Sequence, residues 1–198
     1  GGGVVGTNAV RVAMGMEAQV TVIYKSLPRL KELDFQFGGR LNTVYATVGA
    51  IESYVAEADL VIGAVLVPGA AAPRLVSRDM VREMRDRSVV VDVAIDQGGC
   101  FETSRPTTHS HPTYVEEGVV HYCVTNMPGA VARTSTFALN NATLSYVLAL
   151  ADKGYRQAML DDPGLMQGLN IHRGQVTYRA VADALGYDYV PAEQLLGA

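Results

Sequence analysis

The chain has 198 residues, of which 48% are hydrophobic, and its formal net charge is -4. This composition is sufficient for a folded core in one domain or one and a half, and it is unlike that of a disordered segment. The 16 Lys and Arg residues are scattered and no apolar run reaches the length of a membrane span, so we expect neither nucleic acid nor a membrane as a partner.

The first six residues, GGGVVG, satisfy the pattern Gly-x-Gly-x-x-Gly through Gly1, Gly3 and Gly6. Apolar residues at helical spacing follow over residues 7–15, and residues 19–24 (QVTVIY) have the composition of a strand. A turn, helix and strand of this kind are typical of a dinucleotide-binding unit, in which a pyrophosphate lies at the helix N-terminus. Such a unit also needs a strand before the glycine turn. We therefore expect this chain to be the C-terminal part of a longer protein.

The second strand of a dinucleotide-binding unit usually ends in an acidic residue that binds the ribose hydroxyls. Tyr24 stands at this place, followed by Lys25 and, after one turn, by Arg29. A site with cations and without the carboxylate suits a ribose 2'-phosphate, so NADP is a candidate cofactor beside NAD. The alternative is that Lys25 and Arg29 are solvated surface charges and that Tyr24 packs against the adenosine.

The elements that follow alternate between helices and strands. Helices are predicted over residues 27–37, 51–57 and 78–85, with Ser77 as the N-cap of the last one. Strands are predicted over residues 41–47, 60–69, 89–95 and 119–124. The predicted fold class is α/β, with a Rossmann-type doubly wound parallel sheet whose first strand is missing from the chain.

The apolar run at residues 89–95 ends at Asp96, which is followed by Gln97, Gly98 and Gly99. Ligands bind beyond the carboxyl ends of the strands in such sheets, so a carboxylate here is well placed to act on a bound molecule. The alternative is that Asp96 only caps a turn.

A polar segment without helical period follows Asp96 and favours a functional loop. It contains Arg105, Thr107, Thr108, His109 and His111. At the end of the last predicted strand, Asn126 can bind a carboxamide or a ribose, although Asn before Pro and Gly more commonly forms a turn.

The character of the sequence changes after residue 134. Helices are predicted over residues 137–154, from residues 161–163 onward, and over residues 177–185, with no strand between them. We therefore expect a dinucleotide-binding domain over residues 1–132 and a helical C-terminal segment over residues 133–198 that belongs to another subdomain.

The chain contains only two cysteines, Cys100 and Cys123, both in apolar or glycine-containing surroundings. This usage favours a reducing compartment over a disulfide framework, and no secretory signal is recognisable, so we expect a cytoplasmic protein. The four histidines do not reproduce a zinc-binding spacing, and we expect no metal.

Four segments carry a resemblance to a known family: residues 1–6 (GGGVVG), 58–73 (ADLVIGAVLVPGAAAP), 91–114 (VDVAIDQGGCFETSRPTTHSHPTY) and 121–136 (HYCVTNMPGAVARTST). In these segments the chain resembles L-alanine dehydrogenase, and the resemblance extends over essentially the whole chain. It implies reversible, nicotinamide-dependent oxidative deamination of L-alanine to pyruvate and ammonium. It also implies NAD as cofactor and a homo-oligomer, which for this family is expected to be a hexamer.

The resemblance also assigns roles to single residues. Asp96 would lie beside the nicotinamide and the substrate carbon, where it could orient or deprotonate the water that attacks the iminium intermediate. The pyrophosphate would meet Gly3, Val4 and Val5, and the adenosine ribose would lie at Tyr24. The nicotinamide half would be lined by Val65, Leu66, Val93, Asp96, Asn126 and Met127.

Three features depart from the family pattern. Tyr24 replaces the usual Asp and Ala132 replaces a proline. The Lys, His and Arg that bind pyruvate in this family lie upstream of the glycine turn and have no counterpart here. We expect this chain alone to bind nucleotide and not to turn over alanine. Two alternatives are a non-catalytic dinucleotide-binding module and the nucleotide-binding component of a proton-translocating transhydrogenase.

Overall fold

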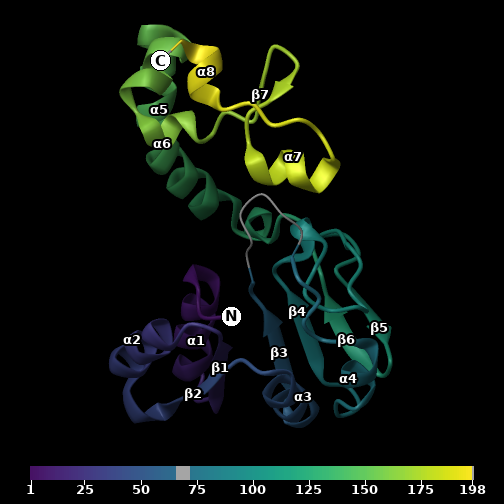
Figure 1. The fold of residues 1–198 in the computed structure, drawn as a ribbon. Helices are drawn as coiled ribbons and strands as arrows, with labels where there is room; N and C mark the ends of the chain where they lie inside the picture. Colours follow the sequence, from purple (N-terminus) through teal and green to yellow (C-terminus); the bar gives the residue numbers. More distant parts are fainter. Residues whose placement is uncertain (66–71, 198) are drawn as a thin grey trace. The chain divides into compact units, whose positions relative to one another are not determined.

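A computed structural model describes residues 1–65 and 72–197 of the chain (Figure 1). The chain divides into two compact units, with a break between Met127 and Pro128. The first unit is a mixed α/β structure with mainly parallel strands, which confirms the predicted fold class, and the second is mainly helical. The predicted domain boundary between residues 132 and 133 stays a prediction.

The first unit begins with alternating helices and strands. They are α1 (Val4–Gly15), β1 (Val20–Tyr24), α2 (Leu27–Phe37), the short 3-10 helix η1 (Gly38–Arg40) and β2 (Leu41–Tyr45). β1 and β2 pair in parallel, from Val20 opposite Leu41 to Tyr24 opposite Tyr45. Their core is made by apolar residues of both helices and both strands, namely Val10, Met14, Val22, Leu30, Leu33 and Leu41.

The second sheet of this unit has the strand order β3-β4-β6-β5. Its elements are α3 (Val48–Glu57), β3 (Leu60–Gly63), α4 (Arg78–Arg82), β4 (Val89–Asp92), the 3-10 helix η2 (Ile95–Gln97), β5 (Thr113–Glu116) and β6 (Val119–Tyr122). β3, β4 and β6 are parallel, as the buried valine-rich runs predict. Ser77 caps α4 as predicted, because its hydroxyl accepts a hydrogen bond from the N–H of Met80 at 3.2 Å.

β5 is an antiparallel edge strand in a region where no strand was predicted. It pairs with β6 through a tight hairpin whose two central residues, Glu117 and Gly118, have φ angles of 52° and 77°. Two consecutive positive φ angles are the requirement of a type I' turn, which suits the twist of a hairpin. The predicted loop therefore ends at residue 112 and the chain returns to the sheet at Thr113.

The strand predicted over residues 89–95 ends earlier than expected, at Asp92. Asp96 does not follow the strand directly but lies in the 3-10 helix η2, so this prediction is wrong. The reason is that the carboxylate of Asp92 accepts hydrogen bonds from the backbone N–H groups of Ala94 and Cys100, which turns the chain out of the sheet. The strands predicted over residues 60–69 and 119–124 also end early, at Gly63 and Tyr122, and residues 66–71 lie outside the described part.

The 3-10 helix η3 (Met127–Val131) leads into the second unit. This unit contains α5 (Ala132–Asp161), α6 (Pro163–Met166), β7 (Ile171–His172), β8 (Gln175–Val176), α7 (Arg179–Leu185) and α8 (Ala192–Leu196). The predicted end of the first long helix at Gly154 coincides with a break in α5, where the φ angle of Gly154 is 74°. No helix among the described residues is long and apolar enough to cross a membrane.

The second unit also contains a hairpin where the sequence predicts only helices. β7 and β8 pair in antiparallel fashion and are joined by Arg173 and Gly174, both with positive φ. Each strand has two residues, which is too short to give an alternating pattern in the sequence.

An ion-pair network fastens α4 to the β5–β6 hairpin. The guanidinium of Arg78 lies 2.6 Å from a carboxylate oxygen of Glu116 and 2.8 Å from one of Glu117, and Arg82 lies 3.1 Å from Glu117. Hydrogen bonds from Arg78 and then Arg82 lower the pKa of Glu117 below its ordinary value of 4.5. Since the folded-state pKa of Glu117 is depressed, the stability that its ion pairs with Arg78 and Arg82 contribute is present above pH 4.5 and is lost as the pH falls below this value.

We expect Glu117→Gln to lower the free energy of unfolding at pH 7 and to make it less dependent on pH between 6 and 3. Urea unfolding of the purified protein and the variant across this range measures both quantities. Added NaCl should shrink the difference at pH 7, because salt screens exposed ion pairs. Equal pH dependence of the two proteins would contradict this assignment.

Candidate functional site

The glycine turn lies at the carboxyl ends of two strands. A Cβ atom on Gly2 would lie 3.2 Å from the ring of Tyr24, the last residue of β1. A Cβ atom on Gly1 would collide with the carbonyl oxygen of Ala64, just after β3, and one on Gly6 with the carbonyl oxygen of Gly1. Residues without side chains are therefore required for the chain to pass from this position into α1.

The N-terminus of α1 is free to receive an anion. The helix begins at Val4 with Gly3 as N-cap, and among the described residues no side chain caps it and no acidic residue lies in its first turn. Val4 is 80% exposed and Val5 is 45% exposed. The first backbone N–H groups of a helix lack intrahelical partners and carry the positive end of the helix dipole, so this end of α1 can hold a phosphate or diphosphate.

Arg29 of α2 is bound to the glycine turn. Its Nε donates a hydrogen bond to the carbonyl oxygen of Gly2 at 2.9 Å, and its Nη2 donates to the hydroxyl of Thr7 at 2.9 Å. Its Nη1 pairs with Glu32 at 2.7 Å. The guanidinium is therefore not the solvated surface charge that one interpretation of the sequence expects. Its predicted contact with a 2'-phosphate stays a prediction.

Tyr24 and Lys25 lie where the sequence places them, at the carboxyl end of β1. Tyr24 is half-buried and its ring borders the glycine turn, whereas Lys25 is exposed. The exposed ammonium of Lys25 is available to an anionic group bound at this end of β1.

The residues predicted for the other half of the site lie at one edge of the second sheet. β3, β4 and β6 are neighbouring parallel strands, so their carboxyl ends share an edge. Just beyond these ends come Val65 after β3, Val93 and Asp96 after β4, and Asn126 and Met127 after β6. Leu66 lies outside the described residues.

Asp96 is carried by a loop that the carboxylate of Asp92 closes. Asp92 is fully buried, and its Oδ1 accepts from the N–H of Ala94 at 3.1 Å while its Oδ2 accepts from the N–H of Cys100 at 2.8 Å. Asp96 lies between these two anchors and its side chain is exposed. An exposed carboxylate at the carboxyl edge of a parallel sheet can bind a water molecule or a substrate and exchange a proton with it.

Asp92, which closes this loop, was not predicted as important, because it stands inside an apolar run whose pattern indicates a continuous strand. The acid in this otherwise apolar run could have indicated a hydrogen-bonded position, because a buried carboxylate needs partners.

The polar loop after η2 lies against the end of β6. The N–H of Thr107 donates to the carbonyl oxygen of Cys123 at 2.9 Å, and the N–H of Thr125 donates to that of Thr107 at 3.1 Å. The ring of His109 donates from Nε2 to the carbonyl oxygen of Asn126 at 3.0 Å. Asn126 has a φ angle of 55°, and this bond helps to hold its left-handed conformation.

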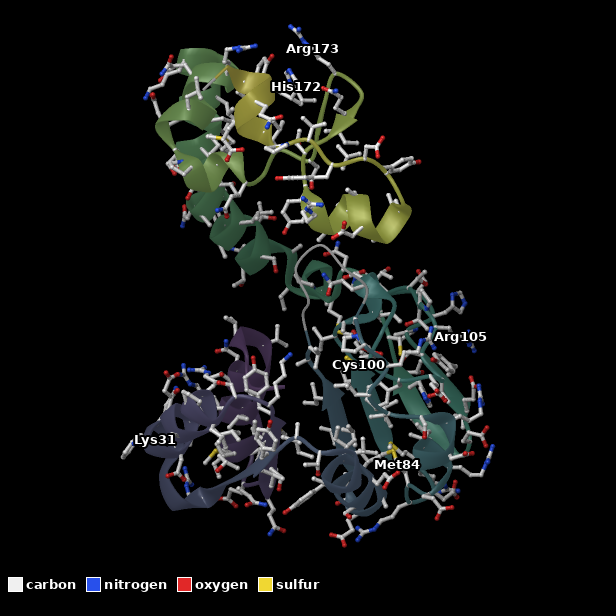
Figure 2. All side chains as sticks on the ribbon, viewed as in Figure 1. Lys31, Met84, Cys100, Arg105, His172 and Arg173 are labelled. Atoms are coloured by element: carbon white, nitrogen blue, oxygen red, sulfur yellow. The ribbon has the colours of Figure 1, made fainter. Side chains whose placement is uncertain are left out.

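Arg105, labelled in Figure 2, also belongs to this loop. Its guanidinium lies 3.8 Å from the ring centroid of Tyr114 in β5. Tyr114 in turn stacks on the buried His121 of β6, with ring centroids 4.8 Å apart. Burial lowers the pKa of His121 and raises that of Tyr114, so both rings are neutral at pH 7. This stack links the polar loop to the sheet by packing rather than by charge pairs.

The described residues contain no group of His, Cys, Asp and Glu side chains that could hold a metal ion. Cys100 and Cys123 are both buried free thiols. The geometry therefore presents an anion site at the glycine turn and an exposed carboxylate at the carboxyl edge of the second sheet.

A family model described as "Alanine dehydrogenase/PNT, C-terminal domain" matches residues 1–179. The chain is 64% identical to the alanine dehydrogenase of Halomonas elongata over 197 residues, which covers 100% of this chain and 53% of that protein. It is 56% identical to the alanine dehydrogenase of Staphylococcus haemolyticus, covering 99% of this chain and 53% of that protein.

Two solved structures are similar in fold. An L-alanine dehydrogenase matches with a TM-score of 0.84 and 51% identity, covering 94% of this chain and 51% of that chain. A transhydrogenase from Sinorhizobium meliloti matches with a TM-score of 0.70 and 25% identity, covering 91% and 48%. The chain thus spans about half the length of the relatives that it matches. These comparisons confirm the predicted resemblance: the chain belongs to the family of alanine dehydrogenase/PNT C-terminal domains.

Proposed function

We propose that this chain is the nucleotide-binding part of an alanine dehydrogenase of about twice its length. The proposed reaction is the reversible oxidative deamination of L-alanine to pyruvate and ammonium with a nicotinamide cofactor. The observation that carries the proposal is 64% identity to an alanine dehydrogenase over 197 residues, which covers the whole chain. A cytoplasmic location and a homo-oligomer, a hexamer by the family resemblance, belong to the same proposal.

The glycine turn fits the cofactor. The free amide end of α1 suits the pyrophosphate, while Tyr24 at the end of β1 suits the adenosine ribose. From there the carboxyl edge of the second sheet, with Val65, Val93, Asn126 and Met127, offers a site for the nicotinamide half. When bound, the cofactor supplies the hydride acceptor or donor of the reaction.

Asp96 is the proposed proton-transfer group. Its exposed carboxylate can orient a water molecule and take up a proton from it, which is the acid–base work that deamination and its reversal require. The groups that bind the carboxylate and carbonyl of pyruvate are proposed to come from the part of the longer protein that precedes this chain.

Two structural features support a preceding part of the chain. Within the described residues, β1 pairs only with β2 and β3 pairs only with β4, and the glycine turn borders the carboxyl ends of both β1 and β3. A strand that leads into Gly1 could therefore pair with the unpaired edge of β1 and with the unpaired edge of β3. In the second unit, α5 exposes large apolar residues that a surface helix normally buries, among them Phe137, Leu144 and Leu148.

The transhydrogenase alternative rests on the second structural match. It predicts hydride transfer between two nucleotides, without any need for alanine. In the full-length protein, reduction of NAD that depends on L-alanine favours the proposal. Transfer between two nucleotides without alanine would favour the alternative. Nucleotide binding without either activity would leave a binding module.

Removal of the Asp96 carboxylate tests the catalytic assignment. In the full-length protein we expect Asp96→Asn to lower kcat for alanine oxidation by at least about a hundredfold, because general acid–base groups contribute this much. The Kd for NADH should change by less than about threefold, since the amide has the shape of the carboxylate and Asp92 still holds the loop in place. Asp34→Asn removes an exposed acid of α2 and serves as the control with unchanged kcat. Full activity of Asp96→Asn would refute the assignment.

Substitutions of Arg29 and Lys25, the two cations near the proposed ribose site, should have different effects on cofactor binding. Because Arg29 holds the glycine turn, Arg29→Ala should weaken NADH and NADPH alike, by about fivefold. Lys25→Ala should weaken NADPH alone by a similar factor, because the exposed ammonium can pair with a 2'-phosphate. Fluorescence titration at matched salt measures the Kd of each variant for NADH and for NADPH, to be compared with those of the unsubstituted protein. Selective loss of NADPH with Arg29→Ala would show that Arg29 leaves the turn to bind the 2'-phosphate.

A further inference from the structure

Asp92 combines complete burial with an unusual number of hydrogen bonds. Its Oδ1 accepts from the N–H of Ala94, and its Oδ2 accepts from the N–H of Cys100 and, at 3.4 Å, from that of Phe101. The hydroxyl of Ser104 donates to Oδ2 at 2.6 Å. Four donors from the eleven residues 94–104 therefore converge on one carboxylate.

Stability alone does not explain an acid at this position. The preceding residues of β4 are valines, and a buried carboxylate is costly compared with an apolar side chain of similar volume. The four donors offset that cost only if the loop takes the one path that brings them together. Asp92 therefore selects a loop conformation rather than simply adding to the core.

The surrounding backbone is shaped to receive this carboxylate. Gly99 has a φ angle of 85°, and a Cβ atom there would lie 2.6 Å from Oδ2 of Asp92. A Cβ atom on Gly63, at the end of β3, would lie 2.8 Å from the ring of Phe101 and 3.4 Å from Oδ1 of Asp92. A side chain at Gly99 or Gly63 would displace the carboxylate or the residues that it holds.

The two anchors of this carboxylate enclose Asp96. Ala94 is held at Oδ1 and Cys100 at Oδ2, and η2 lies between them. Within this segment the N–H groups of Gln97 and Gly99 both donate to the carbonyl oxygen of Ala94, at 2.9 and 3.1 Å. The direction in which the backbone presents Asp96 therefore depends on a carboxylate four residues away.

Ser104 extends the network to the neighbouring strand. The thiol of Cys123, just after β6, donates a hydrogen bond to the hydroxyl of Ser104, with 3.7 Å between sulfur and oxygen. The same thiol lies 3.7 Å from the hydroxyl of Tyr114. The end of β6, where Asn126 follows, is thus connected to the same carboxylate.

We propose that Asp92 is a positioning residue of the nicotinamide half of the site, acting through the loop that it clamps and not through contact with the ligand. This inference rests on the proposed function, because it takes the carboxyl edge of the second sheet as the place of the nicotinamide. It separates the two halves of the cofactor: the adenosine and pyrophosphate contacts lie at the glycine turn, where Asp92 makes no hydrogen bond.

The test compares NADH with ADP-ribose, a probe that lacks the nicotinamide, by calorimetric titration of the full-length protein. In Asp92→Asn an amide NH2 group replaces one of the two carboxylate oxygens, so a donor faces the N–H or hydroxyl donors that the oxygen accepts from in the unsubstituted protein. We expect the Kd for NADH to rise about tenfold, while that for ADP-ribose changes by less than about twofold. Ser104→Ala removes one donor and should give a smaller selective rise for NADH, of about threefold.

Val90→Ala is the matched control. Val90 is fully buried in the same strand, two residues before Asp92, and makes no hydrogen bond to the loop with its side chain. Val90→Ala should destabilise the protein and leave the ratio of the Kd for NADH to the Kd for ADP-ribose unchanged. If Asp92 had only a structural role, Asp92→Asn would likewise leave this ratio unchanged. If Asp92→Asn does not fold, Ser104→Ala decides the question.

Three results would overturn the inference. Equal weakening of NADH and ADP-ribose in Asp92→Asn would show a general structural role. Unchanged constants in both Asp92→Asn and Ser104→Ala would show that the loop does not need this carboxylate. Failure of the unsubstituted protein to bind either ligand would refute the proposed function itself, and the inference with it.

Discussion

The hydrogen bonds of one buried carboxylate determine how the chain leaves the second sheet. Asp92 ends β4 because its Oδ1 binds the N–H of Ala94, which is then not free to continue the ladder, and its Oδ2 binds the N–H of Cys100, which closes the loop that follows. Burial of this acid costs free energy that its four donors must offset. The consequence is a closed loop with an exposed Asp96 at the carboxyl edge of three parallel strands, which is where an α/β sheet binds its ligands.

The glycine turn depends on close packing instead. Gly1 and Gly2 lie against the residues that end or follow β3 and β1, and the guanidinium of Arg29 fastens the turn from α2. Among residues 1–65 and 72–197, no side chain caps the amide end of α1, so its first N–H groups and the positive end of the helix dipole can bind an anion. The uncapped helix end at the turn and the exposed carboxylate at the sheet edge are the two chemical features on which the proposed function depends.

The parts of this structure that depend on local sequence were predictable. α2 has its predicted limits, and Ser77 caps α4, because propensity and capping act over a few residues. The end of β4 was not predictable from pattern, because it is set by Cys100 and Ser104, which lie eight and twelve residues along the chain from Asp92. The same holds for Arg29, whose partner Gly2 is 27 residues away. The β5–β6 hairpin could have been found from Glu117-Gly118 between two short runs rich in β-branched and aromatic residues, whereas the two-residue strands β7 and β8 leave no pattern.

A crystal structure of the full-length protein with bound NADH tests the central claim most directly. The account predicts the pyrophosphate at the amides of Gly3, Val4 and Val5, and the nicotinamide beside the segment from Val93 to Asp96. Asp92 should retain its bonds to Ala94 and Cys100. A nicotinamide bound elsewhere, or a loop that binds it after giving up the bonds to Asp92, would contradict the account.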